Sequence, residues 1–490
     1  MAQGQKWRSF RVDGVWWKPD DPRRLPGTLI VSRSGGLSLS LIVDDLEAPR
    51  PINGPIGVDA SERSGMVMLG LTNDGRRYTL WDGFFAGGNP WSAVFRSVGQ
   101  KQFHFNRGIE GTCDTEPKEL RFSSANVRIG ILAAWLGRTA FDIHGDAFAE
   151  EGWRTLKWIR PQSLAYTLRE GLETSFAWST SGPNMRWFQT SAAVAVRPRL
   201  RMEYTEPASM AICESDLMVV TNLIQLLSGR AIMYREECFI SPSAQTLLSD
   251  GTPIPKELRL LGSRLKLTSG QKSIGPQSLL FPFSSIEQRF GQLLQSWWQL
   301  YRANEHALGS YFSVGRWAGS FADDRFFVTA SAAEAVHAAL NPHQKSLGSG
   351  EWKQIRRALQ AALPEEHRAK LLPKLSHLPR LAFSERIEGL VSALPNGLRQ
   401  RVIGDPERVA HFAKRVKDLR NAKAHQLRHR TTGVELVRLA NKLRVLIDCA
   451  LLQRIGLSGD EVAAAIERCY EYQFYAFDES WPWEVCGGDE

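Results

Sequence analysis

The stretch SGGLSLSLIV, residues 34–43, decides how the first half of the chain folds. Leucine stands at every second position from 37 to 41 with serine between, and successive side chains of a strand point to opposite faces. The pattern therefore predicts a strand with one buried and one exposed face, which the chain enters through a Ser-Gly-Gly turn.

Similar short extended runs lie on both sides of this stretch, separated by turn residues. The residues NDG at 73–75 indicate a hairpin between the runs at 66–71 and 77–81, because Asn, Asp and Gly tolerate the positive φ of a tight turn. One helical pattern, at 214–227, interrupts the series. The spacing predicts an antiparallel β-rich domain over residues 1–240, either a sandwich or a barrel.

After residue 282 the apolar period becomes helical. The residues SSIE at 284–287 have the form of a capping box, and Asp405-Pro406 is an N-cap residue followed by proline at the first helical position. Further helices are expected over residues 324–340, 352–363, 384–394 and 434–455. The fold class is therefore α+β multidomain, with a linker or irregular boundary rich in Ser, Gly and Pro at 241–282 and an all-α bundle of about five to seven helices at 283–490.

The composition is that of a soluble globular protein. The 490 residues are 43% hydrophobic and 23% charged, which indicates about two to four domains. There is no run of about 18 uncharged apolar residues, and the first residues lack the apolar core of a signal peptide. The six cysteines are widely spaced and match neither a disulfide framework nor a zinc knuckle. We expect a cytoplasmic protein with reduced thiols and no membrane partner.

Positive charge is concentrated in one segment. Residues 401–444 contain 12 Lys or Arg against 4 acids, whereas the net charge of the whole chain is +9. Arg420, Asn421 and His425 lie in this segment. Histidine titrates near neutral pH and transfers protons, and arginine offers a planar fork of donors to phosphate oxygens. This combination suits RNA cleavage by the ribose 2′-hydroxyl, which needs no metal or other cofactor.

The three catalytic candidates would not converge on a straight helix. Arg420 and His425 are five positions apart and would point in different directions, so we expect a bend near Asn421, a residue type that can cap a new helical turn. Asn421 and His425 would then share a face, and Arg420 could reach the same phosphate. The cations expected to help bind RNA are Lys417, Lys423, Arg428, His429 and Arg430.

The spacing of Arg420, Asn421 and His425 resembles the signature of HEPN ribonucleases, and the surrounding helices resemble the HEPN module of ApeA-type defence proteins. The first half of the chain resembles the N-terminal domain of the same proteins. The stretches that carry this second resemblance are GVWWKP at 14–19, LPGTL at 25–29, LGLTNDG at 69–75 and YTLWD at 78–82.

The resemblance implies a metal-independent endoribonuclease and a HEPN fold for the helical bundle. It implies a homo-oligomer, at least dimeric through the HEPN domain, in which Arg and His of two chains form one cleft. In ApeA-type proteins the activity serves abortive infection, in which a quiet enzyme is released by a phage-encoded trigger and cuts host RNA, with tRNA favoured. Residues 1–240 would then sense the trigger or restrain the enzyme.

Other interpretations of the same residues stay open. Arg420, Asn421 and His425 could form a capped helix end on a solvated face, within an ordinary basic surface. The chain could be a catalytically silent nucleic-acid or nucleotide-binding module, or a helical scaffold. Glu334 and His337 have the spacing of helical metal ligands, but a di-metal bundle needs a second pair, so we expect a structural role for them. The segment 461–490, with 8 acids and one Arg, could pack on the bundle or restrain the basic cleft.

Overall fold

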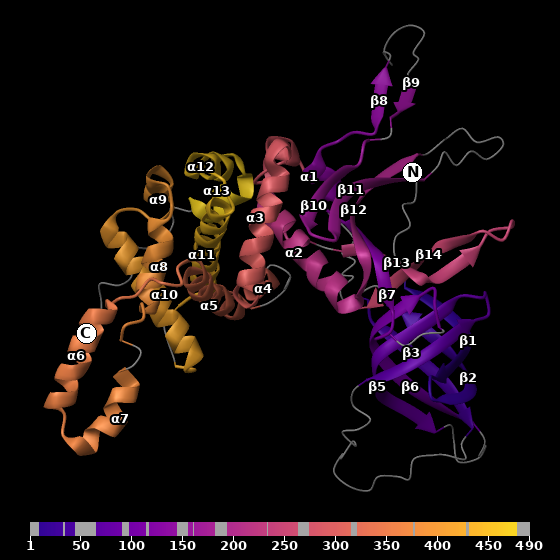
Figure 1. The fold of residues 1–490 in the computed structure, drawn as a ribbon, viewed down its shortest axis with the longest axis horizontal. Helices are drawn as coiled ribbons and strands as arrows, with labels where there is room; N and C mark the ends of the chain where they lie inside the picture. The colour runs from indigo at the N-terminus through magenta and orange to yellow at the C-terminus, as the bar shows by residue number, and fades with distance from the viewer. Residues whose placement is uncertain are drawn as a thin grey trace. The chain divides into compact units, whose positions relative to one another are not determined.

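The computed structural model describes residues 9–32, 35–44, 65–90, 98–113, 117–144, 155–159, 161–181, 194–232, 234–262, 274–314, 321–375, 378–427 and 431–477. The chain divides into two compact units (Figure 1). Unit 1 comprises residues 1–221 and 232–274, and unit 2 comprises residues 222–231 and 275–490. The chain thus enters unit 2 for ten residues, returns to unit 1, and then completes unit 2.

Unit 1 contains a twelve-stranded sheet, half of which closes on itself. Six strands in the order β6-β3-β2-β1-β4-β5 form a ring, because β5 also pairs with β6. These strands are β1 (Phe10–Lys18), β2 (Asp21–Val31), β3 (Leu37–Asp44), β4 (Met66–Thr72), β5 (Arg77–Pro90) and β6 (Val98–Glu110). The β-rich prediction is confirmed, and of the two predicted forms this part is a barrel.

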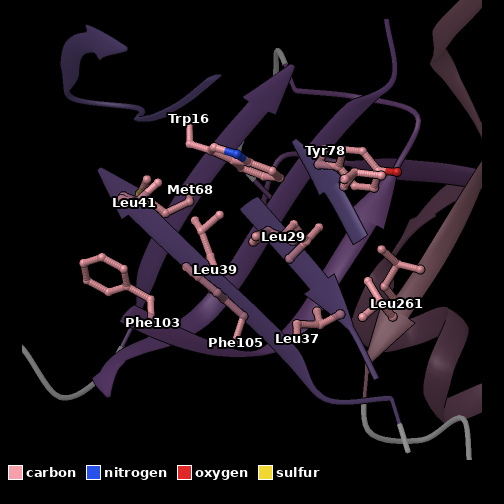
Figure 2. Packing of buried hydrophobic residues seen from close by; sticks show 13 residues of the cluster. Trp16, Leu29, Leu37, Leu39, Leu41, Met68, Tyr78, Phe103, Phe105 and Leu261 are labelled. Carbon is pink, nitrogen blue, oxygen red and sulfur yellow. The ribbon is translucent and has the colours of Figure 1, made fainter. Parts of the chain in front are cut away.

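The alternating leucines of β3 fill the barrel. Leu37, Leu39 and Leu41 are almost fully buried, and they pack with Trp16 and Tyr78, whose ring centroids lie 6.0 Å apart (Figure 2). The predicted hairpin at 73–75 joins β4 to β5, with the Gly75 N–H donating to the Thr72 carbonyl at 2.9 Å. The alternation of leucine and serine along this strand therefore predicts its buried face correctly.

The sheet continues beyond the barrel from β6 in the order β14-β13-β7-β12-β11-β10. These strands are β7 (Arg121–Ile129), β10 (Leu164–Arg169), β11 (Leu172–Ser181), β12 (Ala195–Ser209), β13 (Tyr234–Leu247) and β14 (Pro253–Gly262). Unit 1 also holds the short helix α1 (Leu132–Leu136) and a separate hairpin of β8 (Phe141–His144) and β9 (Thr155–Trp158).

Two strands occupy the segment predicted as a linker. Strand β13 runs to Leu247 and β14 spans Pro253–Gly262, so the prediction of a linker is wrong for most of residues 241–262. The abundant Ser, Pro and Gly there belong to an irregular stretch of β13 and to the turn between the two strands, since the register shifts between Ile240 and Gln245. The two units divide at residues 274 and 275.

Helix α2 (Met210–Ser228) is the helix predicted at 214–227, and it begins in unit 1 and ends in unit 2. Among the described residues it alone is long and apolar enough to cross a membrane by length and composition. Because 72% of that apolar window is buried in the structure, α2 has the character of a core helix.

Unit 2 is helical. Its described helices are α3 (Phe290–Ala303), α4 (Glu305–Val314), α5 (Ala322–Leu340), α6 (Ser349–Ala362), α7 (Glu365–Leu375), α8 (Phe383–Ser392), α9 (Asn396–Val402), α10 (Pro406–Ala424), α11 (Gly433–Arg454), α12 (Gly459–Arg468) and α13 (Tyr470–Ala476). The described residues from 275 onward thus contain eleven α-helices, more than the five to seven predicted, because several are too short to show a clear apolar period.

The expected capping box at 284–287 does not start a helix. These residues form two 3₁₀ turns, Phe283–Ser285 and Glu287–Arg289, and the Ser285 hydroxyl donates to the Pro282 carbonyl instead. Helix α3 begins only at Phe290 and buries Leu293, Leu294 and Trp297, as its apolar period indicates.

Candidate active site in the helical unit

Helix α10 carries the three predicted catalytic residues at its C-terminal end. The Asp405 carboxylate accepts a hydrogen bond from the Arg408 N–H at 2.9 Å and Pro406 is the first helical residue, as the sequence predicts. The helix then continues without interruption to Ala424, so the predicted bend at Asn421 is wrong. The Asn421 carbonyl remains in the helical ladder, where it accepts from the His425 N–H at 3.0 Å.

The helix ends at Ala424, three residues after Asn421, in a Schellman motif. The Leu427 N–H donates to the Ala422 carbonyl at 2.8 Å and the Gln426 N–H donates to the Lys423 carbonyl at 3.2 Å, with Gln426 at a φ of 54°. His425 is therefore the C-cap residue, and its side chain is exposed.

Arg420 is directed into the bundle and held by three side chains. Its Nη2 donates to Oε2 of Glu334 on α5 at 3.1 Å, and its Nη1 donates to Oδ1 of Asn421 at 3.2 Å. The guanidinium carbon lies 5.3 Å from the ring centroid of Phe383 on α8. The Arg420 side chain is 30% exposed, so a phosphate can still reach it.

One donor of Arg420 is left over. Its Nε is buried and has no hydrogen-bond partner among the described residues. A buried N–H without an acceptor costs free energy, so the site gains stability from any oxygen that reaches this atom. The guanidinium thus has fixed geometry and spare donor capacity, which are the properties of an anion-binding arginine.

The structure separates Arg420 from His425 within one chain. Five helical residues turn the side-chain direction by about 140° on an unbroken helix. Arg420 contacts α5 and α8, whereas His425 lies exposed beyond the last helical residue. The side chains of Arg420 and Asn421 are brought together, and within the described residues the His425 side chain forms no hydrogen bond with either of them.

Glu334 and His337, which have metal-ligand spacing, contact different residues. Glu334 binds Arg420, whereas His337 is 2% exposed and packs against α8, where a β-carbon on Gly389 would overlap its Nε2. Burial, with a further contribution from Arg386, lowers the pKa of His337. Sequence reasoning missed Glu334 and Phe383 as neighbours of Arg420, because no local pattern connects residues so far apart in the chain.

Much of the basic segment is neutralised in the folded unit. Lys423 lies 3.5 Å from Asp323 and 3.8 Å from Asp324, and Lys417 lies 4.0 Å from Asp418. Both lysines keep more than a third of their side chains exposed, so they stay available to a polyanion. Arg428, His429 and Arg430 lie outside the described residues.

The middle of α10 is also tied to the start of α11. The Arg415 guanidinium contacts Glu435 at 2.8 and 3.1 Å, and the Thr431 hydroxyl donates to the same carboxylate at 2.7 Å. Burial acts to raise the pKa of Glu435, but the hydrogen bonds from Arg415 and Thr431 outweigh it and lower the pKa. This contact fixes where the segment that follows His425 re-enters the bundle.

The described acids near the C-terminus have partners away from Arg420. Glu461 pairs with Arg289, Glu467 with Arg401 and Glu471 with Arg230. These acids therefore pack on the bundle. The remaining acids of the predicted tail, from residue 478 onward, lie outside the described residues.

A pocket of about 700 Å³ lies beside the start of α11. Its wall includes Val434 and Val437 of α11 and Phe474 of α13, and the α5 residue Ala322 closes one side. Val434 and Phe474 are 59% and 67% exposed, so the apolar rim faces solvent in a single chain.

Two protein-family models match the chain. The model of the Apea-like HEPN domain matches residues 328–461, which include Glu334, Arg420 and His425, and the model of ApeA N-terminal domain 1 matches residues 11–297, more than half of the chain. No curated protein and no solved structure matches the chain. A HEPN domain suggests ribonuclease activity in general, and its presence supports a nuclease-type defence protein. The chain belongs to the ApeA family and joins an ApeA N-terminal domain to an Apea-like HEPN domain.

Proposed function

We propose that this protein is a metal-independent RNA endonuclease of an abortive-infection system. The observation that carries the proposal is the position of Arg420, which lies in a matched HEPN domain, is held by three neighbours and still has an unused donor. The ribose 2′-hydroxyl attacks the adjacent phosphate and expels the 5′-oxygen. The products are a 2′,3′-cyclic phosphate and a 5′-hydroxyl end, so no outside water is consumed.

Each motif residue has a distinct role in this reaction. His425 transfers the proton at the attacking or leaving oxygen, because an imidazole can both accept and donate a proton. Arg420 stabilises the charge that grows on the phosphate, a role in which loss of one donor typically costs about 3 to 4 kcal/mol. Asn421 positions Arg420 through its 3.2 Å hydrogen bond.

The complete site is proposed to need two chains. Arg420 and His425 diverge within one chain, so a second HEPN domain has to supply the missing partner. The exposed apolar side chains Phe321, Val434 and Phe474 offer a surface for that association. The RNA is proposed to be host RNA, with tRNA favoured, in the cytoplasm. A phage-encoded trigger acting through the N-terminal domain would release the activity.

Replacing Arg420 or His425 by Ala is expected to lower cleavage by at least about a hundredfold, because each variant loses transition-state stabilisation or proton transfer. The measurement is incubation of purified protein with total RNA, followed by mapping of the cut ends, with a chelator in a parallel reaction. The matched control is Lys414→Ala, a change on the same helix outside the site. Full activity in either site variant, or strict dependence on a divalent ion, contradicts the proposal.

Mixing the two inactive variants extends this experiment to the two-chain site. A mixed dimer has Arg420 from one chain and His425 from the other, so cleavage should return to about a quarter of the wild-type level when chains pair at random. A site built from one chain gives no recovery.

The second candidate is a silent nucleic-acid or nucleotide-binding module. The ion pair between Arg420 and Glu334 favours it, because a neutralised guanidinium can bind without promoting chemistry. End mapping separates the two candidates, since a binding module leaves the RNA uncut.

A further inference from the structure

One face of the sheet in unit 1 gathers arginines from three strands, β7, β12 and β14. On β12, Arg197, Arg199 and Arg201 alternate with the buried Pro198, Leu200 and Met202, so the three arginines share the opposite face. The register places Arg199 beside Arg128 of β7, because Leu200 pairs with Val127. On β14, Arg259 pairs with Cys238 of β13 and completes the group.

We call Arg128, Arg197, Arg199, Arg201 and Arg259 the arginine face. Four described glutamates form ion pairs with these five arginines. Glu236 lies 3.7 Å from Arg128 and 3.4 Å from Arg199, Glu257 lies 3.8 Å from Arg199, and Glu203 lies 2.7 Å from Arg201. Arg259 faces Glu110 of β6 at 3.5 Å.

The arginine face has positive charge beyond what its acids neutralise. Glu236 is shared between two arginines, and within the described residues Arg197 has no ion pair. The Nε atoms of Arg199 and Arg201 are buried without a hydrogen-bond partner in the described part of the chain. Burial lowers the pKa of Arg128, and the nearby cations Arg197, Arg235 and Arg199 lower it further against the effect of Glu236. A surface needed only for stability would pair these charges more evenly.

The linear sequence hides this surplus. The arginines come from positions between 128 and 259, so no single segment of the sequence contains all five. The strand order β12-β7-β13-β14 brings the strands that carry them together in one sheet.

We propose that the arginine face binds the phosphate backbone of single-stranded RNA. Three arginines along β12 recur at intervals of about 6.7 Å, a spacing comparable with that between successive phosphates of an extended nucleic-acid strand. The face also extends across four strands, or about 14 Å, which is wider than one phosphate group. Planar guanidinium groups with unused donors suit phosphate oxygens. This role goes beyond cleavage at Arg420 and does not depend on it.

The test measures binding without cleavage. Full-length His425→Ala protein is titrated into a fluorescent oligouridylate of about 20 nucleotides, and the Kd is followed as salt rises from roughly 50 to 200 mM. Adding Arg197→Gln and Arg199→Gln removes two contacts, so the Kd should rise about tenfold and the slope of log Kd against log salt should fall by about 1.4. The matched control adds Arg11→Gln and Arg23→Gln, two exposed, ion-paired arginines of the barrel strands, and should leave both values unchanged.

A variant that is expected to tighten RNA binding keeps the test decisive if replacing Arg197 and Arg199 disturbs folding. Glu236→Gln removes the acid shared by Arg128 and Arg199, and should tighten RNA binding about threefold, because the surplus charge grows. If the Kd and the salt slope stay unchanged in both sets of variants, the proposal is overturned. The arginines and glutamates of this face would then have a structural role only. If uridine monophosphate at equal charge displaces the RNA, the face binds a mononucleotide and the proposal is overturned. If polyglutamate at equal charge displaces it, the face binds an acidic protein and the proposal is overturned as well. Cleavage plays no part in any readout, so failure here is distinct from failure of the nuclease assignment.

Discussion

In the proposed site, Arg420 meets a carboxylate where a phosphate would bind. The Glu334 side chain is 36% exposed, so its ion pair with Arg420 contributes modest free energy and can yield to a substrate. While the pair exists, it keeps the guanidinium on the α5 side of α10. In the proposed reaction, Glu334 would therefore position Arg420, and its charge would compete with RNA.

Glu334→Gln and Glu334→Ala should separate these two effects. Glutamine keeps an acceptor for Arg420 without the negative charge, so KM should fall while kcat stays near the wild-type value. Alanine removes the acceptor, and kcat should fall about fivefold, equivalent to about 1 kcal/mol. Steady-state cleavage of a defined RNA measures both constants. A purely structural Glu334 would instead lower the melting temperature of both variants without moving KM and kcat apart.

The sequence predicts the motif residues and misses what holds them. Arg420, Asn421 and His425 are close together along the chain, and their chemistry can be read from residue type and spacing. Glu334 lies 86 residues earlier, and Phe383 lies in another helix, so only tertiary packing connects them to the motif. The expected bend failed because Asn421 uses its side chain for Arg420 and keeps its carbonyl in the helix.

At the scale of elements, α10 depends on the packing of α5 against α8. Buried His337 of α5 fits beside Gly389 of α8, and any β-carbon there would overlap the imidazole. Glu334 and Phe383, which contact Arg420, belong to the same two helices. The spacing between α5 and α8 therefore controls the arginine.

Two glycines in neighbouring helices give a matched pair of variants. Gly389→Ala should destabilise the protein by about 1 to 3 kcal/mol through overpacking against His337. Gly397→Ala in α9 meets nothing within 4 Å and should stabilise it by up to about 1 kcal/mol, because alanine favours helix. Denaturant unfolding measures both changes. Equal effects of the two substitutions would show that His337 moves aside freely.

Helices and strands could be predicted where the spacing of their apolar residues is regular over a long stretch of sequence. The leucines at 37, 39 and 41 and the Asp405 cap both have local causes, and the structure contains both features. The strands at 241–262 were missed because a shifted register and a turn interrupt their alternation with Ser, Pro and Gly. The short helices of unit 2 are stabilised by packing, which no local pattern records.

At the scale of the whole molecule, unit 2 takes ten residues, 222–231, from between the two segments of unit 1. Asn222 donates to the Tyr301 hydroxyl at 3.1 Å, and the Leu227 and Ser228 carbonyls accept from Phe281 and Leu280. The Gly229 carbonyl accepts from Arg444, whose side chain also approaches buried Asp448 at 3.5 Å. Tyr311 and Tyr472 each donate to that carboxylate at 2.5 Å.

A fragment of residues 275–490 should therefore fold poorly by itself. It lacks the hydrogen bonds made by residues 222–231, which at about 1 kcal/mol each approach the net stability of a small domain. A matched fragment that joins 222–231 to 275 through a Gly-Ser linker should recover helix content and cooperative melting. Circular dichroism compares the two, and identical melting curves would contradict this account.

The short excursion of the chain through residues 222–231 also bears on how such proteins can evolve. Recombination at a single junction after residue 274 would deliver unit 2 without residues 222–231, which are part of its own interior, and the recipient would misfold. We therefore expect the two units to be inherited together and to change by substitutions within one lineage. Exchange of unit 1 between genes, which a simple linker would permit, would cost unit 2 its stability.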